Sequence, residues 1–286
     1  MGEGELRVAA EGLAFAEGPR WHDDRFWFSD MHDGRVLRLE PDGSLTTVAD
    51  VAAQPSGLGW LPDGRLLIVS MTDRRLLRQE HDGSLVEAAD LSALAPWHCN
   101  DMVVDGQGRA YVGNFGFELY DPPITPVPTV LVLVEPNGQA RVVADGVKFP
   151  NGMVITPDGS TLIVGESFGG CLTAFDIAAD GSLSGRRVWA ELEPAVPDGI
   201  CLDAEGAVWV ASPISHGAVR VAEGGEVLDR VSLGEDRQAF ACMLGGPSGR
   251  TLHLCTASTS VPAKCLDRRD GRIETVEVDV PGAGWP

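Results

Sequence analysis

The fold can be inferred from one segment, FPNGMVITPDG at residues 149–159. An apolar run follows a polar residue, Asn151, and ends at a Pro-Asp-Gly turn. Pro157 presets φ for a tight turn, and Gly159 can adopt the positive φ that such turns require. The segment is therefore expected to be a strand with a polar residue at its head and a turn at its foot.

The same arrangement recurs five more times along the chain. In each copy one residue stands eight positions before the turn glycine or its equivalent, and we call these residues the head positions. Successive head positions are 39 to 51 residues apart. A repeat of roughly 40 to 50 residues, rich in short strands, is typical of one blade of a β-propeller. The head positions are Glu17, Ser56, Asn100, Asn151, Asp198 and Ala241.

The residues between head positions predict four short strands in each copy. In the first copy, residues 26–29 follow the first turn, and Asp33-Gly34 turns the chain into the next strand. Residues 6–9 are a further strand candidate, which could pair with the last copy and remove an open sheet edge. We predict an all-β protein, with one six-bladed β-propeller domain of four-stranded antiparallel blades over residues 1–286.

The third copy departs from the repeat. A long connection, residues 114–128, follows its second strand and contains four prolines. Prolines at this density predict an irregular loop, and a long loop in a compact domain is usually functional or disordered. We expect it to form a lid or wall over the central cavity; a plain surface insertion is the alternative.

Composition and charge exclude several classes of protein. The chain has 22 basic and 42 acidic residues and a net charge of −20, which argues against nucleic-acid binding. Its six cysteines form no Cys-x-x-Cys pair, and neither a secretory signal nor an 18-residue apolar run is present. These features predict reduced, mostly buried cysteines, a cytoplasmic location, no membrane partner, and a monomer or weak homo-oligomer.

The head positions carry the functional argument. The first strand of each propeller blade lines the axis, so Glu17, Asn100, Asn151 and Asp198 should converge near one end of the channel. Two buried carboxylates are unfavourable unless a proton or a cation neutralises them. Because every donor atom is oxygen, the set favours one hard divalent ion, with Ca²⁺ first, Mg²⁺ or Mn²⁺ next and Zn²⁺ less suited.

The recurrence of these residues matters more than any single motif. A Glu-Gly-Pro, Pro-Asn-Gly or Pro-Asp-Gly triplet alone is commonly only a turn. Four oxygen-bearing side chains at one register of a repeat are far more specific. Ser56 and Ala241 supply no strong ligand, which would leave coordination positions open for water or substrate.

Four motifs carry a family resemblance: residues 17–19 (EGP), 100–101 (ND), 149–153 (FPNGM) and 197–200 (PDGI). In this order and spacing they resemble the SMP-30/gluconolactonase/luciferin-regenerating-enzyme-like family, over nearly the whole chain. The resemblance implies a six-bladed propeller with one catalytic divalent metal ion in the central channel. Many members hydrolyse sugar lactones, and others are related to phosphotriesterases.

The resemblance also assigns roles to residues. The family's metal ligands fall on Glu17, Asn151 and Asp198, and Asn100 matches an asparagine that contacts substrate or, in some relatives, the metal. Animal members carry an arginine two residues before that asparagine, where it helps to bind a sugar acid. Here that residue is His98, so the resemblance does not imply a preference for gluconolactone.

The reaction predicted from this site is metal-assisted opening of a small lactone by water. Asp198 is the best candidate to accept the water's proton, with Glu17 and Asn151 holding the ion and Asn100 orienting the substrate. Four side chains are weaker candidates for substrate contacts. They are His98, Asn114, Glu166 and His216.

The same residues are compatible with two other functions. One is a phosphotriesterase or arylesterase that uses the same ion. The other is a non-catalytic propeller that binds a protein partner. The last would be expected to carry apolar residues at the head positions, whereas four of the six here keep oxygen donors.

Overall fold

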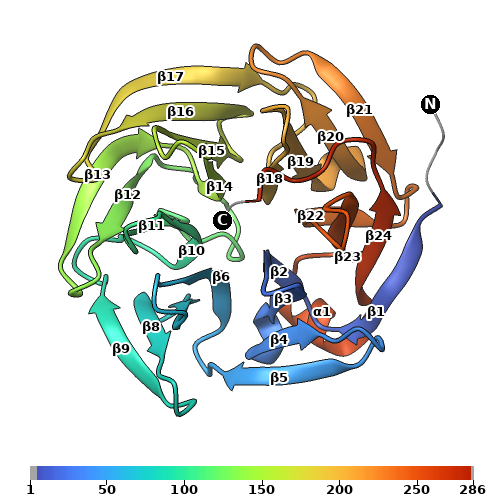
Figure 1. Ribbon diagram of the computed structural model, residues 1–286, viewed down its shortest axis with the longest axis horizontal. Coiled ribbons are helices and arrows are strands. Elements are labelled where there is room, and N and C mark those ends of the chain that lie inside the picture. The colour runs from blue at the N-terminus through green and yellow to red at the C-terminus, as the bar shows by residue number, and fades with distance from the viewer. Residues whose placement is uncertain (1–4, 285–286) are drawn as a thin grey trace.

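In the computed structural model, which describes residues 5–284, six four-stranded antiparallel sheets surround one axis (Figure 1). Each sheet is one blade, and the strand that begins at or next to a head position lies innermost. The predicted six-bladed β-propeller is therefore confirmed. The strands of the first three blades are β2 (Ala16–His22), β3 (Arg25–Asp30), β4 (Arg35–Leu39) and β5 (Leu45–Asp50); β6 (Pro55–Trp60), β7 (Leu66–Ser70), β8 (Arg75–Gln79) and β9 (Leu85–Asp90); β10 (Cys99–Val104), β11 (Ala110–Asn114), β12 (Thr129–Val134) and β13 (Ala140–Val147).

The remaining blades follow the same order. The sixth blade takes its outermost strand from the start of the chain. The strands are β14 (Pro150–Ile155), β15 (Thr161–Glu166), β16 (Cys171–Ile177) and β17 (Leu183–Glu191); β18 (Ile200–Leu202), β19 (Val208–Ser212), β20 (Gly217–Val221) and β21 (Val227–Ser232); β22 (Gln238–Gly245), β23 (Thr251–Ala257), β24 (Gly271–Glu277) and β1 (Arg7–Leu13).

Strand β1 closes the ring. It pairs antiparallel with β24, from Arg7 opposite Thr275 to Leu13 opposite Gly271. Leu13 is buried in the core between the sixth blade and its neighbours. The closing strand expected at residues 6–9 is thus present and longer than predicted, because pairing with β24 continues to the buried Leu13.

The hydrophobic core lies between neighbouring blades. The second strands β7, β11 and β19 are buried at every residue, since blades cover both of their faces. The largest fully buried side chain is Trp209 on β19. This packing holds the inner strands at fixed positions around the axis.

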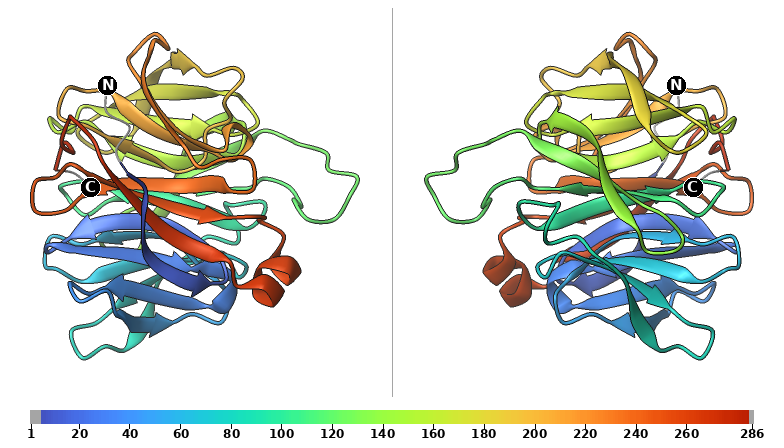
Figure 2. Two further views of the ribbon diagram at one scale, coloured as in Figure 1. Left: turned by 90° about the vertical axis from the view of Figure 1, so that its right-hand side faces the viewer. Right: turned by 90° about the vertical axis from the view of Figure 1, so that its left-hand side faces the viewer.

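The connections after the second strands all lie at one end of the propeller, beside the starts of the inner strands. We call this the head end. Two connections project there: the segment after β11 and helix α1 (Pro262–Arg268), between β23 and β24 (Figure 2). Residues 115–128 contain no helix or strand, as predicted, whereas Asn114, which was assigned to the same loop, is the last residue of β11. Helix α1 was not predicted. Short 3₁₀ turns, η1 (Met31–Asp33) and η2 (Pro213–Ser215), occupy two further connections.

All six cysteines are buried and none forms a disulfide, in agreement with the composition. Within residues 5–284, no helix is long and apolar enough to cross a membrane.

Candidate metal centre

The inner strands place the oxygen-bearing head residues at a common level. Glu17, Asn100 and Asn151 are the second residues of β2, β10 and β14, and Asp198 lies two residues before β18. Strand pairing is interrupted at this point in β2, β10 and β14, which is the mark of a β-bulge. A bulge bends the strand and re-aims a side chain, and bulges are common beside active sites.

Gly152 explains how closely the inner strands approach one another. A Cβ at this position would collide with the backbone nitrogen of Ile200 and lie 2.8 Å from the carbonyl oxygen of Asp198. The Gly152 N–H donates to that same carbonyl at 3.0 Å. Only glycine permits this contact, which brings Asn151 and Asp198 together. The glycine after the head residue therefore serves close strand packing instead of a turn.

The carboxylates of Glu17 and Asp198 influence one another strongly. Burial raises the pKa of Glu17 well above its usual value, and the negative charge of Asp198 raises it further. Burial likewise raises the pKa of Asp198, and the charge of Asp101 adds to this effect. The buried Asp198 Oδ1 has no hydrogen-bond partner among the described residues. Two mutually repelling carboxylates, one with a free buried oxygen, form an arrangement that a cation would stabilise.

The two amides flank this pair. The Asn151 side chain lies close enough to the Asp198 carboxylate to lower its pKa by hydrogen bonding, and Asn151 Nδ2 donates to Ser167 Oγ at 3.3 Å. Ser167 Oγ in turn donates to the carbonyl oxygen of Pro197 at 2.7 Å. Asn100 Nδ2 donates to the carbonyl oxygen of Pro150 at 3.3 Å. In both amides Nδ2 has a protein acceptor, which leaves Oδ1 free to bind a cation or a substrate.

An ion pair lies one step further along the inner strands. Arg20 Nη2 donates to Asp101 Oδ1 at 2.7 Å and also contacts the Met102 carbonyl oxygen, and both charged side chains are buried. The guanidinium partly offsets the acidic charge that surrounds Glu17. Because the head residues stand at the starts of the inner strands, the candidate centre lies towards the head end.

The donor set fits a hard divalent cation. It consists of oxygen atoms from two carboxylates and two amides, which is what Ca²⁺ and related ions prefer. Across residues 5–284, no group of three or more His, Cys, Asp or Glu side chains is arranged as a metal cluster. A cation at this centre would thus depend on the asparagine oxygens as well as on Glu17 and Asp198.

Apolar side chains surround the centre at the head end, and we call them the rim cluster. They come from residues before or near the start of the inner strands, from the connections after the second strands, from the end of β23 and from α1. Trp97, Leu119 and Tyr120 pack against the cluster and are half-buried. The buried members are Phe15, Met31, Met71, Phe115, Phe117, Phe149, Phe240, Ala257 and Cys265.

The weaker substrate candidates occupy different surroundings. His98 is half-buried in the rim, its ring centroid 5.1 Å from that of Trp97 and 6.0 Å from that of Phe115, and burial lowers its pKa. The fully buried Asn114 instead joins the two ends of the long loop: Nδ2 donates to the Val130 carbonyl oxygen at 2.8 Å, and Oδ1 accepts from Thr129.

Glu166 and His216 also make contacts within the protein. Glu166 is buried, and its oxygens accept from Arg186 Nη2 at 2.8 Å, Thr173 Oγ1 at 2.6 Å and the Lys148 N–H at 2.7 Å. His216 Nδ1 lies 2.8 Å from the Arg237 carbonyl oxygen. No contact brings these two side chains to the Glu17–Asp198 pair within the described part of the chain.

One residue near the centre was missed from the sequence. The half-buried Tyr120 lies in the long loop, and burial, Glu17 and Asp198 all raise the pKa of its hydroxyl. The loop therefore brings a phenol close to both carboxylates. A loop without periodicity offers no signal for which of its side chains turns inward.

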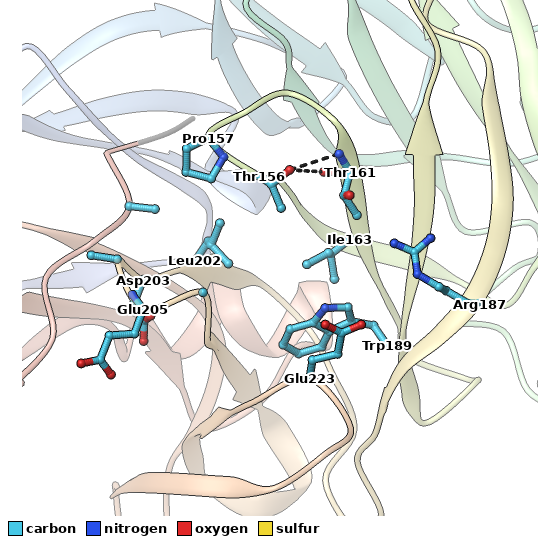
Figure 3. A pocket seen from close by; sticks show the side chains of 13 residues that line it. Thr156, Pro157, Thr161, Ile163, Arg187, Trp189, Leu202, Asp203, Glu205 and Glu223 are labelled. Atoms are coloured by element: carbon cyan, nitrogen blue, oxygen red, sulfur yellow. Dashed lines mark hydrogen bonds between the residues drawn. The ribbon is translucent and has the colours of Figure 1, made fainter.

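A separate pocket of about 510 Å³ lies between the fourth and fifth blades, at the opposite end of the inner strands (Figure 3). Thr156, Trp189 and Asp203 are among its lining residues, and Asp203 already accepts a 2.6 Å bond from Arg220. None of the sequence-predicted site residues lines this pocket.

A sequence model of the SMP-30/gluconolactonase/LRE-like region matches residues 15–258. Among curated proteins, pentonolactonase XacC of Haloferax volcanii is 27% identical over 258 residues, covering 88% of this chain and 84% of the relative. The 6-deoxy-6-sulfogluconolactonase of Pseudomonas putida is 26% identical, covering 98% of this chain and 96% of the relative. Among solved structures, a luciferin-regenerating enzyme superposes with a TM-score of 0.82 at 19% identity, covering 98% of this chain and 97% of that one.

Proposed function

Because the chain belongs to the SMP-30/gluconolactonase/LRE-like family, we propose that it is a hydrolase that opens a small lactone at a centre holding one divalent metal ion. Two relatives of nearly full coverage are named as lactonases, and both names refer to sugar lactones. Sugar lactones are therefore the reference substrates for this proposal. The oxygen ligands favour Ca²⁺, with Mn²⁺, Mg²⁺ and Zn²⁺ as alternatives.

One observation carries the proposal: Glu17 and Asp198 are forced together in a buried position, and Asp198 Oδ1 lacks a protein donor. Such a pair is costly without a cation. Glu17, Asn151 and Asp198 would hold the ion, with Asn100 Oδ1 beside it. When bound, a divalent ion at this position supplies Lewis-acid chemistry and favours the ionised form of both carboxylates.

The chain's own residues supply the remaining steps. Asn100, fixed through its Nδ2, orients the lactone with its carbonyl towards the Glu17–Asp198 pair. Asp198 accepts a proton from the water that attacks the carbonyl carbon. The acyl–oxygen bond of the ring then breaks, and the departing ring oxygen takes that proton to give a hydroxy acid. The rim cluster limits the access of bulk water, which strengthens the electrostatic interactions at the centre.

The decisive experiment is proton release from a panel of lactones by protein that has been stripped with a chelator and then reloaded with Ca²⁺, Mn²⁺, Mg²⁺ or Zn²⁺. We expect hydrolysis to disappear on stripping and to return with at least one ion. An aryl ester and a phosphotriester in the same panel test the two alternative esterase reactions. If the stripped protein hydrolysed lactones as fast as the reloaded protein, the result would contradict the metal-dependent mechanism.

We also propose that the protein works in a reducing compartment such as the cytoplasm, because six buried cysteines remain unpaired. Two of them, Cys201 and Cys242, have sulfur atoms 3.8 Å apart without a bond.

A further inference from the structure

The side chains around the approach to the centre indicate the chemical class of the lactone, an inference that rests on the proposed function. Four aromatic rings stand on the Asn151 side of the approach. Phe149 stacks on Phe115 with centroids 4.7 Å apart, and Phe117 and Phe168 lie 5.7 and 5.3 Å from it. Phe117 and Phe168 also meet edge to face at 5.2 Å. We call these four rings the aromatic shelf.

The shelf connects the centre to the surface. Phe149 stands two residues before Asn151, and Phe168 directly follows Ser167, which accepts from Asn151. Phe149 and Phe117 are buried, whereas Phe168 is 43% exposed. Phe168 is therefore the part of the shelf that a substituent of a ligand can reach, and it stands next to the Ser167 that binds Asn151. Stacking on such rings stabilises apolar and aromatic groups.

The outer part of the head end is apolar as well. Six of the large hydrophobic side chains exposed on the described surface lie on its connections, and the others lie on the outer strands β1, β13, β17 and β21. Exposed apolar groups gathered at one end commonly mark a binding region. The six are Ile124, Val127, Phe168, Ile214, Val261 and Leu266.

We propose that the preferred substrate is a lactone whose ring carries an aromatic or alkyl substituent, seated on the exposed Phe168 ring at the outer edge of the aromatic shelf. A polyhydroxylated ring would leave its hydroxyl groups against apolar surface, where they lose hydrogen bonds to water.

The test compares lactones of equal ring size on the metal-reloaded protein. We expect kcat/KM for γ-phenyl-γ-butyrolactone and γ-nonalactone to exceed that for a pentono-γ-lactone by at least about tenfold, since a hydrophobic contact of this size contributes roughly that factor. Equal values, or a higher value for the pentonolactone, would overturn the inference while leaving the proposed lactonase intact.

Variants locate the preference on the shelf. Phe168→Ala, at the exposed ring, and Phe117→Leu, at the buried ring that packs on it, should each raise KM for the phenyl lactone several-fold more than KM for the pentonolactone. Val188→Ala, at an exposed residue of β17 outside the head end, is the control and should change neither. If Phe168→Ala changed KM equally for both substrates, the result would contradict binding of the substituent at Phe168.

Binding gives a readout that needs no turnover. Calorimetry with 5-phenyl-2-pyrrolidinone, a lactam that resists hydrolysis, should show binding to the Ca²⁺-loaded protein that weakens several-fold in Phe168→Ala. If no lactone is hydrolysed but the lactam binds in this way, the proposed reaction fails and the apolar seat stands. If the lactam does not bind, the inference is overturned.

Discussion

At the scale of single residues, the centre depends on two carboxylates that destabilise each other. Burial raises the pKa values of both Glu17 and Asp198, and the charge of Asp198 raises that of Glu17 further. Each carboxylate therefore has opposite effects with and without a cation. Without a cation the buried negative charge destabilises the folded protein. With a cation the same carboxylate binds the metal and is stabilised by it.

This opposition gives the first prediction. Glu17→Gln should raise the unfolding temperature of the chelator-treated protein, by about 2 °C or more, because it removes one buried charge. The same change should weaken metal binding at least about tenfold, and Asp198→Ala should abolish lactone hydrolysis. Scanning calorimetry and titration with Ca²⁺ measure the two effects.

Ser56→Ala is the matched control, because Ser56 is also a buried head residue and Ala241 occupies the same register in the sixth blade. It should change neither quantity appreciably. A Glu17→Gln protein that binds Ca²⁺ as tightly as the parent would remove Glu17 from the ligand set.

The second prediction concerns Gly152. Gly152→Ala should push β14 away from β18 and cost about 1–3 kcal/mol of unfolding free energy. It should also weaken metal binding, because Asn151 and Asp198 move apart. Gly106→Ala is the control, since a Cβ there meets no atom within 4 Å. Unfolding in urea and calorimetric titration check both parts; unchanged metal affinity in a destabilised Gly152→Ala protein would contradict the link.

At the scale of elements, β23 carries a buried histidine that should make stability depend on pH. His253 stacks on Phe26 at 4.4 Å, and burial lowers its pKa from 6.5 to about 4. The unfolded chain therefore binds a proton in a pH range where the folded chain does not. The stability that His253 contributes is complete above about pH 6.5 and is lost as the pH falls towards 4, by about 3 kcal/mol.

The third prediction is that His253→Phe reduces this loss. Urea unfolding at pH 7.5 and at pH 5 should differ less for His253→Phe than for the parent protein. His81→Phe, at an exposed histidine, should keep the parent's dependence. An unchanged pH dependence in His253→Phe would show that other groups dominate the acid instability.

The elements also show how far the sequence predicts this structure. The blades were predictable, because each one is a repeat of strand, turn and strand, and five of the six carry a polar residue at a constant register. Helix α1 was missed because it has only seven residues, and its one buried side chain, Cys265, packs on members of the rim cluster that are distant in the sequence. A contact of this kind leaves no pattern in the neighbouring residues.

The candidate site divides in the same way. Glu17, Asn100, Asn151 and Asp198 were found because symmetry brings equivalent positions to one axis. Symmetry does not place Glu166 in this way. Its hydrogen-bond partners Arg186 and Thr173 lie on other strands of the same blade, so they can be identified only from the structure. The aromatic shelf brings together Phe149, which precedes β14, and rings from the connections after β11 and β15. Composition alone does not reveal this arrangement.

At the scale of the whole molecule, the ring depends on β1. Our fourth prediction is that Leu13→Ala costs about 2–5 kcal/mol of unfolding free energy, because Leu13 is buried where β1 seals the sixth blade. Val8→Ala, at an exposed residue of the same strand, should stay within about 0.5 kcal/mol of the parent. Equilibrium unfolding in urea measures both; equal values for the two variants would mean that β1 contributes little to closure.

The origin of the sixth blade has a consequence for biosynthesis. Strand β1 leaves the ribosome first, yet its partner β24 begins only at residue 271. At about 5–20 residues per second, translation keeps the two apart for roughly 13 to 50 seconds. Throughout that time the nascent protein exposes an unpaired strand, and the first five blades are complete before the ring can shut. A chaperone that shields residues 7–13 during translation would thus protect the step on which the finished channel depends.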